Sequence, residues 1–477
     1  MTDLYKLSAV ELTRKIKSRE ILVSDIAKVF VQRIKEVNPL INAIQQFDAE
    51  LIIEASVNAD KLLLANCKIG KLFGLPLAIK DAFHIKGFIC SKGSLGLYNT
   101  SAKYDATVVA RLKKAGAHIY GITNTSELLL SYESNNLVYG KTKNPYDLSR
   151  TPGGSSGGSA AIIAVGGVPI SIGNDAGGSL RQPAHYCGIC THKPTHGLIP
   201  TTGNYPVDGY GIAAQLVAIG PMARYVEDLI LMMEVMSGSD GIDPHSVPIK
   251  YSGKKVVDLK QLKIAYFYDN PGGTFPTQET IKAIDIVVEL LKPKVNQVRE
   301  IYPPILNEVH RLHFETIMLG GDSGQSLKQL IDTFKNKKIS PLTYEFLELA
   351  NQSQFSVTEL RQRFVELERF RYKMNLFMKD YDIIISPVSA TPAKKHGETF
   401  ANVRDFGYIT AHNLTGWPAT VLPCVISNEG LPIGVQLVSK PWQDYVSLNV
   451  ALYLQKIIGV FPIPQINNKQ VRDMVYD

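Results

Sequence analysis

Hydrophobic residues recur at helical spacing over the first part of the chain. Ser8-x-x-Glu11 forms a capping box directly ahead of the first such segment. Ser24 is the predicted N-cap of a second helix, which we expect to stop at Pro39 because the residue before a proline disfavours the helical conformation. A third helix is predicted over 49–64. The chain is therefore expected to open with three helices.

Short apolar runs and helical segments alternate along the rest of the chain. Strands are expected at 75–79, 118–122, 263–268, 382–386, 419–425 and 434–438, and helices at 106–114, 278–291 and 445–457. Residues 308–380 carry a mostly helical, amphipathic pattern. The alternation is typical of βαβ units and predicts an α/β sheet. No repeat or linker divides the chain, so we expect one domain over 1–477, although the length alone favours about three.

Residues 153–211 depart from this pattern. They hold 14 of the 37 glycines of the chain and only four charged side chains. A surface loop rich in glycine would also be polar or charged, whereas closely packed interior backbone accounts for a segment that is rich in glycine and nearly uncharged. We therefore expect this segment to lie inside the protein.

A run of glycines and serines, 153–159, opens this segment. A flexible linker is a poor interpretation, because strongly apolar sequence follows directly. The run also matches the G-x-S-x-G nucleophile elbow at Ser155 and again at Ser156. An elbow needs an acidic residue and then a histidine later in the chain, for which Asp382 and His412 are available. Alternating glycines and serines match this motif by chance, so the signal is weak.

Two further motifs offer candidate chemistry. Ala176, Gly177 and Gly178 precede Ser179, and such small residues expose consecutive backbone N–H groups, as an oxyanion hole requires. The alternative is a tight turn with a solvated serine. Lys80 ends an apolar strand, where most lysines reach solvent. In a dry site, however, desolvation lowers the pKa of a lysine and lets it serve as a base.

Residues 185–196 contain the pair Cys187-x-x-Cys190 and three histidines. Structural zinc motifs usually pair C-x-x-C with a second pair of ligands some distance away, which this crowded segment lacks. We expect buried cysteines and no metal site. The five cysteines are too scattered for a disulfide framework, which favours a reducing compartment. No nucleotide-binding glycine motif is present, so no cofactor is expected.

Composition and charge narrow the classes of protein. Apolar residues make up 45% and charged residues 20%, as in ordinary globular proteins rather than disordered ones. The net charge of +7 is not concentrated in a basic tract, so nucleic-acid binding is not expected. The longest apolar stretch, 160–173, is too short to span a bilayer, and residues 1–20 lack a signal-peptide core. A cytoplasmic protein is expected.

Lys80, the run 153–159 and the run 175–181 together resemble the amidase signature family of serine hydrolases. Ser155 lies 75 positions after Lys80, and Ser179 lies 24 positions after Ser155, as in that family. The similarity covers nearly the whole chain. Further matching segments are 74–81, 187–188, 193–195, 413–419 and 430–436.

The resemblance implies one α/β domain with a central mixed β-sheet surrounded by α-helices. Its signature core would span about 70–210, and a helical region at about 308–380 would shape the substrate pocket. Ser179 would be the nucleophile, Ser155 the bridging serine, and Lys80 the base. The peptide bond before Ser155 would be cis, and backbone N–H groups of 176–179 would hold the oxyanion.

These roles describe amide hydrolysis through an acyl-enzyme. A neutral Lys80 takes a proton from Ser155, which takes one from Ser179, and the relay then runs backward onto the departing nitrogen. Neither a metal nor a histidine is required. The expected partner is a small-molecule amide, and a homodimer is possible.

The segment 126–136 bears on the substrate. It resembles the fatty acid amide hydrolase branch of the family, and its leucines and Tyr132 suggest an apolar pocket for an acyl or aryl amide, with Ser131 as a candidate substrate-binding residue. A plain core helix accounts for Leu128 to Leu130 almost as well. The alternative function is the glutamine-hydrolysing A subunit of a tRNA-dependent amidotransferase, and a third is binding without catalysis.

Overall fold

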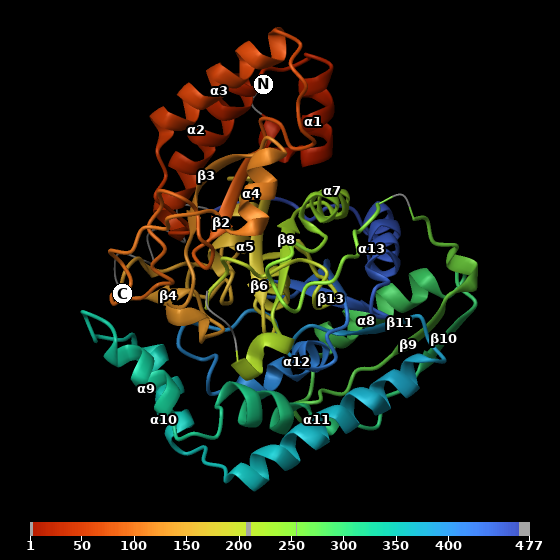
Figure 1. Ribbon diagram of the computed structural model, residues 1–477. Coiled ribbons are helices and arrows are strands. Elements are labelled where there is room, and N and C mark those ends of the chain that lie inside the picture. Colours follow the sequence, from red (N-terminus) through yellow and green to blue (C-terminus); the bar gives the residue numbers. More distant parts are fainter. Residues whose placement is uncertain (1–2, 207–210, 254, 467–477) are drawn as a thin grey trace.

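A computed structural model describes residues 3–206, 211–253 and 255–466 (Figure 1). They build one sheet of 11 strands in the order β1-β3-β2-β6-β8-β7-β12-β13-β11-β9-β10, beside a small ribbon of β4 and β5. In chain order the strands are β1 (Ile44–Gln45), β2 (Pro76–Lys80), β3 (His118–Thr123), β4 (Asn135–Asn136), β5 (Gly140–Lys141), β6 (Ile170–Asp175), β7 (Cys190–Lys193), β8 (Ala218–Ala223), β9 (Lys263–Tyr266), β10 (Gln297–Glu300), β11 (Ile383–Pro387), β12 (Ala419–Ile426) and β13 (Pro432–Ser439).

The sheet mixes parallel and antiparallel pairs. Strand β2 runs parallel to both β3 and β6, and β9 runs parallel to both β10 and β11. The pairs β6–β8, β8–β7, β7–β12, β12–β13 and β13–β11 are antiparallel. The predicted α/β architecture with a central mixed sheet is thus confirmed.

Helices surround this sheet. They are α1 (Ala9–Lys17), α2 (Val23–Ile41), α3 (Ala49–Leu64), α4 (Thr107–Lys114), α5 (Gly157–Ala164), α6 (Arg181–Cys187), α7 (Val226–Met236), α8 (Gln278–Leu291), α9 (Gln325–Asp332), α10 (Pro341–Asn351), α11 (Val357–Met378), α12 (Gly407–Leu414) and α13 (Asp444–Ile458). Short 3₁₀ turns are η1 (Leu4–Lys6), η2 (Glu127–Leu129), η3 (Gly211–Gln215), η4 (Leu259–Gln261), η5 (Leu306–Glu308) and η7 (Val403–Phe406), and η6 (Arg311–Met318) is a π-helix. In the described part of the chain, no helix is both long and apolar enough to cross a membrane.

The pattern-based predictions hold for most elements, and the second helix is the exception. Helix α2 begins at Val23, before the predicted cap Ser24, because the Asp60 carboxylate of α3 accepts both of their backbone N–H groups. It continues through Pro39 to Ile41, so the predicted stop is wrong. Only two residues of the helix follow Pro39, and the proline removes a single backbone donor, so the loss is confined to the last turn.

The glycine-rich segment lies inside the protein, as predicted for its described part; residues 207–210 lie outside the described residues. Helix α5, strand β6, helix α6 and strand β7 are buried along their whole length. Helix α5 contacts β2, β6 and β8, and α6 contacts β7, β12 and β13. The segment therefore forms the middle of the core.

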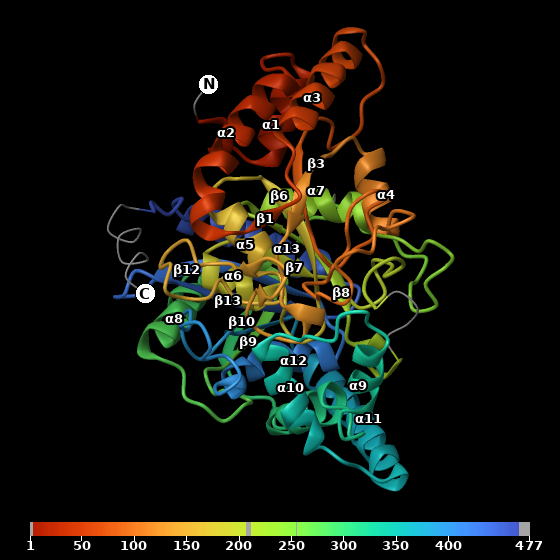
Figure 2. The ribbon, with the colours of Figure 1, turned by 90° about the vertical axis from the view of Figure 1, so that its left-hand side faces the viewer.

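The helical ends of the molecule lie on opposite sides of this core. Figures 1 and 2 show α1, α2 and α3 at one end and α9, α10 and α11 at the other. The π-helix η6 belongs to the second group and contacts α11 and α12. Residues 308–380 are mostly helical, as predicted.

Candidate active site

Lys80 is the last residue of β2 and is completely buried. Its Nζ lies 2.7 Å from Ser155 Oγ and 2.7 Å from Asn174 Oδ1. Asn174 lies near the end of β6, and because β2 and β6 are parallel, their carboxyl ends reach the same edge of the sheet. The structure thus brings the predicted base and the predicted bridging serine into direct contact.

The surroundings of Lys80 favour its uncharged amine. Burial holds the pKa of Lys80 well below its ordinary value, and the nearby Asp175 opposes this only in part. An uncharged amine has two hydrogens and one lone pair, so it can donate to one partner and accept a proton from another. The contact with Ser155 is therefore one along which a proton can move.

Asn174 is a site residue that the sequence did not single out. Its Nδ2 donates to Asn204 Oδ1 at 2.9 Å, which fixes the amide with its oxygen toward Lys80. A carbonyl oxygen only accepts, so it takes an N–H of the amine. The one sequence signal for this role is its position directly before the run 175–181.

Ser155 is held in a tightly packed stretch of backbone. Its own carbonyl accepts the Thr125 hydroxyl at 2.6 Å, and the N–H of Gly154 donates to Gln182 Oε1 at 2.9 Å. A Cβ on Gly154 would meet Ser131 O at 2.6 Å, so this position has no room for a side chain. The Gly154–Ser155 peptide bond is cis, as the resemblance implies.

Ser179 lies in the turn between β6 and α6, residues 176–180, which we call the β6–α6 turn. Its carbonyl accepts the N–H of Ser156 at 3.2 Å, so the two serine-bearing segments are in contact. Ser179 is partly exposed, whereas Ser155 and Lys80 are buried. Of the two predicted serines, Ser179 is therefore the one that solvent reaches.

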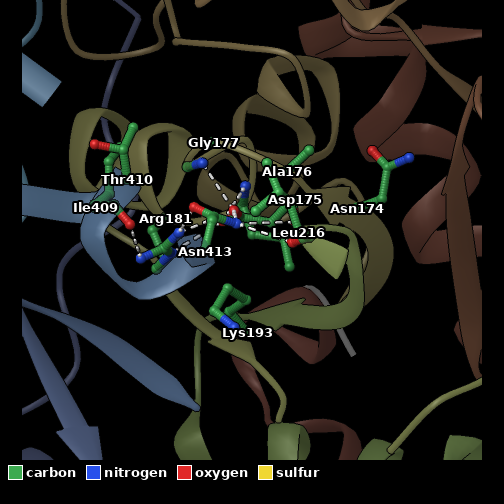
Figure 3. Close-up of polar contacts among 12 residues, drawn as sticks. Asn174, Asp175, Ala176, Gly177, Arg181, Lys193, Leu216, Ile409, Thr410 and Asn413 are labelled. Carbon is green, nitrogen blue, oxygen red and sulfur yellow. Dashed lines mark hydrogen bonds and ion pairs between the residues drawn. The ribbon is translucent and has the colours of Figure 1, made fainter. Parts of the chain in front are cut away.

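The β6–α6 turn is folded around the buried carboxylate of Asp175 (Figure 3). Asp175 Oδ1 accepts the N–H of Gly178 at 2.7 Å, and Arg181 binds the carboxylate through Nε at 3.0 Å and Nη2 at 2.9 Å. Asn413 Nδ2 donates to Asp175 Oδ1 at 2.8 Å. Burial alone would raise the pKa of Asp175, but Arg181 and Asn413 hold it far below its ordinary value, so the carboxylate is charged.

Two other side chains, neither identified from the sequence for this contact, bind the carbonyl groups of the same turn. Tyr132 Oη donates to Gly177 O at 2.7 Å, and His313 Nε2 lies 2.9 Å from Ala176 O. His313 comes from the π-helix η6, far along the chain, so no local motif signals it.

Residues 126–136 line this region without forming a regular core helix. Leu128 packs in an apolar cluster with Ile331 and Phe334, and Leu130 is partly buried against it. Ser131 is buried, and its Oγ accepts the N–H of Glu133 at 3.1 Å. Its carbonyl lies against Gly154, one residue from Ser155.

The residues of the nucleophile-elbow alternative are engaged elsewhere. Asp382 binds Lys440 and the N–H of Lys263, and His412 is buried with its ring stacked on Trp417. Ser155 instead contacts the amine of Lys80, as described above.

The cysteines and histidines of residues 185–196 bind separate partners. Cys187 and Cys190 are buried, and their Sγ atoms contact the carbonyls of Pro152 and Arg224. His192 is bound by Asp444, 3.1 Å from its Nε2. Within the described ranges, no group of three or more potential ligands could hold a metal ion.

Known proteins share this sequence pattern and fold. A family model described as Amidase matches residues 25–448. Fatty-acid amide hydrolase 2 of Homo sapiens is 32% identical over 492 residues, covering 97% of this chain and 91% of that protein. An A subunit of the glutamyl-tRNA(Gln) amidotransferase of Clostridium acetobutylicum is 31% identical over 486 residues, covering 95% of this chain and 99% of that protein.

A solved structure agrees with these relatives. The structure of 6-aminohexanoate cyclic dimer hydrolase complexed with substrate superposes with a TM-score of 0.85 at 25% identity, covering 97% of this chain and 99% of that chain. The family match and both relatives extend over most of the sequence. The chain therefore belongs to the amidase signature family and is a hydrolase that acts on carbon–nitrogen bonds in amides.

Proposed function

We propose that this chain cleaves a carboxamide to a carboxylate and an amine, or ammonia, by a Ser-Ser-Lys relay through an acyl-enzyme. The observation that carries the proposal is the 2.7 Å contact between Ser155 Oγ and the fully buried amine of Lys80. A buried lysine in contact with a serine hydroxyl is suited to accept its proton. Burial disfavours the charged ammonium, so before the reaction the amine is uncharged and has a free lone pair for that proton.

The proton path runs outward from the lysine. Ser155 gives its proton to Lys80 and takes one from Ser179, which attacks the amide carbonyl carbon. When the carbon–nitrogen bond breaks, the same two groups return a proton to the departing nitrogen. Water then repeats the sequence on the acyl-enzyme, releasing the carboxylate.

Backbone N–H groups of the β6–α6 turn would hold the oxyanion. The N–H of Gly178 is directed to Asp175, so we assign the donor role first to the N–H groups of Ala176, Gly177 and Ser179. Each donor aimed at the developing charge contributes about 3 kcal/mol to a transition state of this kind. The ion pair of Asp175 and Arg181 stabilises the conformation of the turn.

Two apolar clusters, one against the turn and one that includes Leu128 of the segment 126–136, favour an acyl or aryl amide as substrate. Ala176 packs against a cluster that includes Leu312 and Ile317 of η6, within the region 308–380 that was predicted to shape the pocket. Leu128 and Phe334 belong to a second cluster, beside the segment that carries Ser131. We assign the substrate-pocket wall to these clusters and Ser131.

The alternative function is glutamine hydrolysis as the A subunit of an amidotransferase. The Clostridium acetobutylicum relative is named as such a subunit, and its sequence identity to this chain is close to that of the fatty-acid amide hydrolase. This similarity is the reason to retain the alternative. A cytoplasmic location and a homodimer remain predictions from the sequence.

One experiment separates the two functions. The isolated chain is labelled with a fluorophosphonate probe and assayed on a panel of acyl amides, aryl amides and glutamine, with and without the other amidotransferase subunits. We expect labelling at Ser179 and turnover of acyl or aryl amides by the isolated chain. Glutamine turnover that requires added subunits would select the alternative, and turnover unaffected by Ser179→Ala would refute the relay.

A further inference from the structure

Two rings from outside the glycine-rich segment hold the carbonyl groups of the β6–α6 turn. His313 Nε2 lies 2.9 Å from Ala176 O, and Tyr132 Oη lies 2.7 Å from Gly177 O. His313 belongs to the π-helix η6, and such helices are rare and are found frequently at functional sites. Both contacts are made on the backbone that precedes Ser179.

These contacts fix the direction of two consecutive peptide groups. The peptide bonds of the turn are trans, so each carbonyl points opposite to the N–H of the next residue. By binding Ala176 O, His313 sets the direction of the Gly177 N–H. By binding Gly177 O, Tyr132 sets the direction of the Gly178 N–H, which donates to Asp175 at 2.7 Å.

The chemistry of His313 fits a donor rather than a packing residue. A carbonyl oxygen only accepts, so Nε2 must carry the hydrogen. Burial lowers the pKa of His313 to about 4, so near neutral pH the ring is uncharged and Nδ1 has no hydrogen. Among the described residues, this buried Nδ1 has no hydrogen-bond partner. Such an orphan acceptor is unfavourable, and an apolar ring would serve better if packing were its only role.

Both rings also contact the turn directly at Gly177. A Cβ on that glycine would lie 2.8 Å from His313 Cε1 and 3.3 Å from Tyr132 Oη. Because Gly177 has no side chain, both rings can contact the backbone at this position. Tyr132 is itself braced by Phe406, with ring centroids 4.3 Å apart.

We propose that His313 is a positioning residue that aims the backbone N–H of Gly177 at the oxyanion formed when Ser179 attacks an amide, and that Tyr132 supports this orientation by fixing the next peptide group, whose N–H donates to Asp175. The inference rests on the proposed nucleophile. A donor that is already oriented stabilises the developing charge without reorganisation, so its effect is felt in the transition state. Losing either ring contact thus lowers kcat and leaves KM nearly unchanged.

The test uses His313→Phe and Tyr132→Phe, which keep the rings and remove the donors, and His313→Gln, which restores an N–H donor. His310→Phe is the matched control. His310 directly precedes η6, and its ring stacks on Phe314. Each variant is assayed for the rate of fluorophosphonate labelling, for kcat and KM on an acyl p-nitroanilide, and for its melting temperature.

We expect both Phe variants to lower kcat and the labelling rate about 10- to 100-fold with KM within about threefold, which is less than the loss of a whole oxyanion donor. His313→Gln recovers most of the rate, and His310→Phe behaves as wild type. A trifluoromethyl ketone, which forms a tetrahedral adduct, binds the Phe variants more weakly in parallel with kcat.

Normal labelling and kcat in His313→Phe would overturn the inference. So would a loss that His313→Gln does not recover, or one that appears in KM alone. If the His313→Phe protein is unstable, Tyr132→Phe carries the test, because removal of one hydroxyl leaves its ring in place. Ser179→Ala separates the two levels: an active Ser179→Ala protein refutes the proposed function, whereas an inactive one with a fully active His313→Phe refutes only the positioning role.

Discussion

The proposed relay and the proposed oxyanion hole, which we call the relay side and the oxyanion side of Ser179, are built in different ways. On the relay side, Lys80, Ser155 and Asn174 come from strand ends and buried backbone, joined by contacts of 2.7 Å. On the oxyanion side, the turn is held from outside by two rings, one of them His313 on the π-helix η6. The proposed relay therefore consists of the reacting groups themselves, whereas the proposed oxyanion hole depends on how the backbone of the turn is oriented.

Replacing the nucleophile gives the largest expected effect. Ser179→Ala removes the attacking oxygen, so we expect kcat to fall on the order of 10⁶-fold, as for other serine hydrolases. Fluorophosphonate labelling should be lost as well. Ser149→Ala, at an exposed serine, is the control and should behave as wild type. Residual labelling of the Ser179→Ala protein would place the nucleophile elsewhere.

Replacing the base should cost somewhat less, about 10²- to 10⁴-fold, since a general base contributes that much. In the wild type, only the uncharged Lys80 can accept a proton, so the rate should rise with pH through its lowered pKa and then level off. Lys193 is a second fully buried lysine, and its pKa is lowered to about 7 chiefly by burial, so it serves as a control for which amine causes the rise in rate with pH. We expect the Lys193→Met enzyme to keep this rise. The Lys80→Met enzyme should have a low rate that no longer rises with pH, as measured by pH profiles of kcat/KM.

The two sides also differ in how far the sequence predicts them. The helix expected at 278–291 is α8, and the strand ending at Lys80 is β2. Such elements can be predicted because the local hydrophobic periodicity and the residues that end each element specify them. The contact of Lys80 with Ser155 is one that the family resemblance predicts, although Ser155 lies outside the sheet, in the buried backbone just before α5. His313 lies 137 positions from its partner Ala176 and in no motif, so only tertiary packing brings it to the turn.

At two other positions the neighbouring sequence is also a poor guide to the structure. Pro39 is a helix-stopping signal, yet α2 extends past it because the last turn loses little there. Asn174 directly precedes the run 175–181, but its role depends on Asn204, which orients the amide from a separate segment. Side-chain orientation of this kind is set by three-dimensional neighbours and not by spacing along the chain.

The buried ion pair beneath the turn should matter more for stability than for chemistry. Arg181→Leu leaves the Asp175 carboxylate buried without its cation, so we expect a loss of about 3–5 kcal/mol in the free energy of unfolding. Lys292→Ala, which breaks an exposed ion pair with Glu289, should lose less than about 0.5 kcal/mol. Denaturant unfolding of both variants measures the difference, and equal losses would contradict it.

The pH dependence of this stability has a definite sign. The pKa of Asp175 is lowered on folding, so its contribution is present above its ordinary value of 3.8 and is lost as the pH falls below that value. Arg181→Leu should therefore flatten the loss of stability in acid. An unchanged acid limb would show that another carboxylate dominates there.

Asn174→Asp is the finest test of the relay side, since it changes one charge beside the amine. A carboxylate at this position would lie about as close to Lys80 Nζ as the amide oxygen does, at 2.7 Å, and a neighbouring negative charge favours the ammonium form. The pKa of Lys80 should rise, and the pH profile of kcat/KM should move to higher pH by about one unit or more. Asn174→Ala adds no charge, so it should lower the rate without this alkaline shift. A profile that moves equally in both variants, or in neither, would mean that the amine acting as base is not the one that Asn174 contacts.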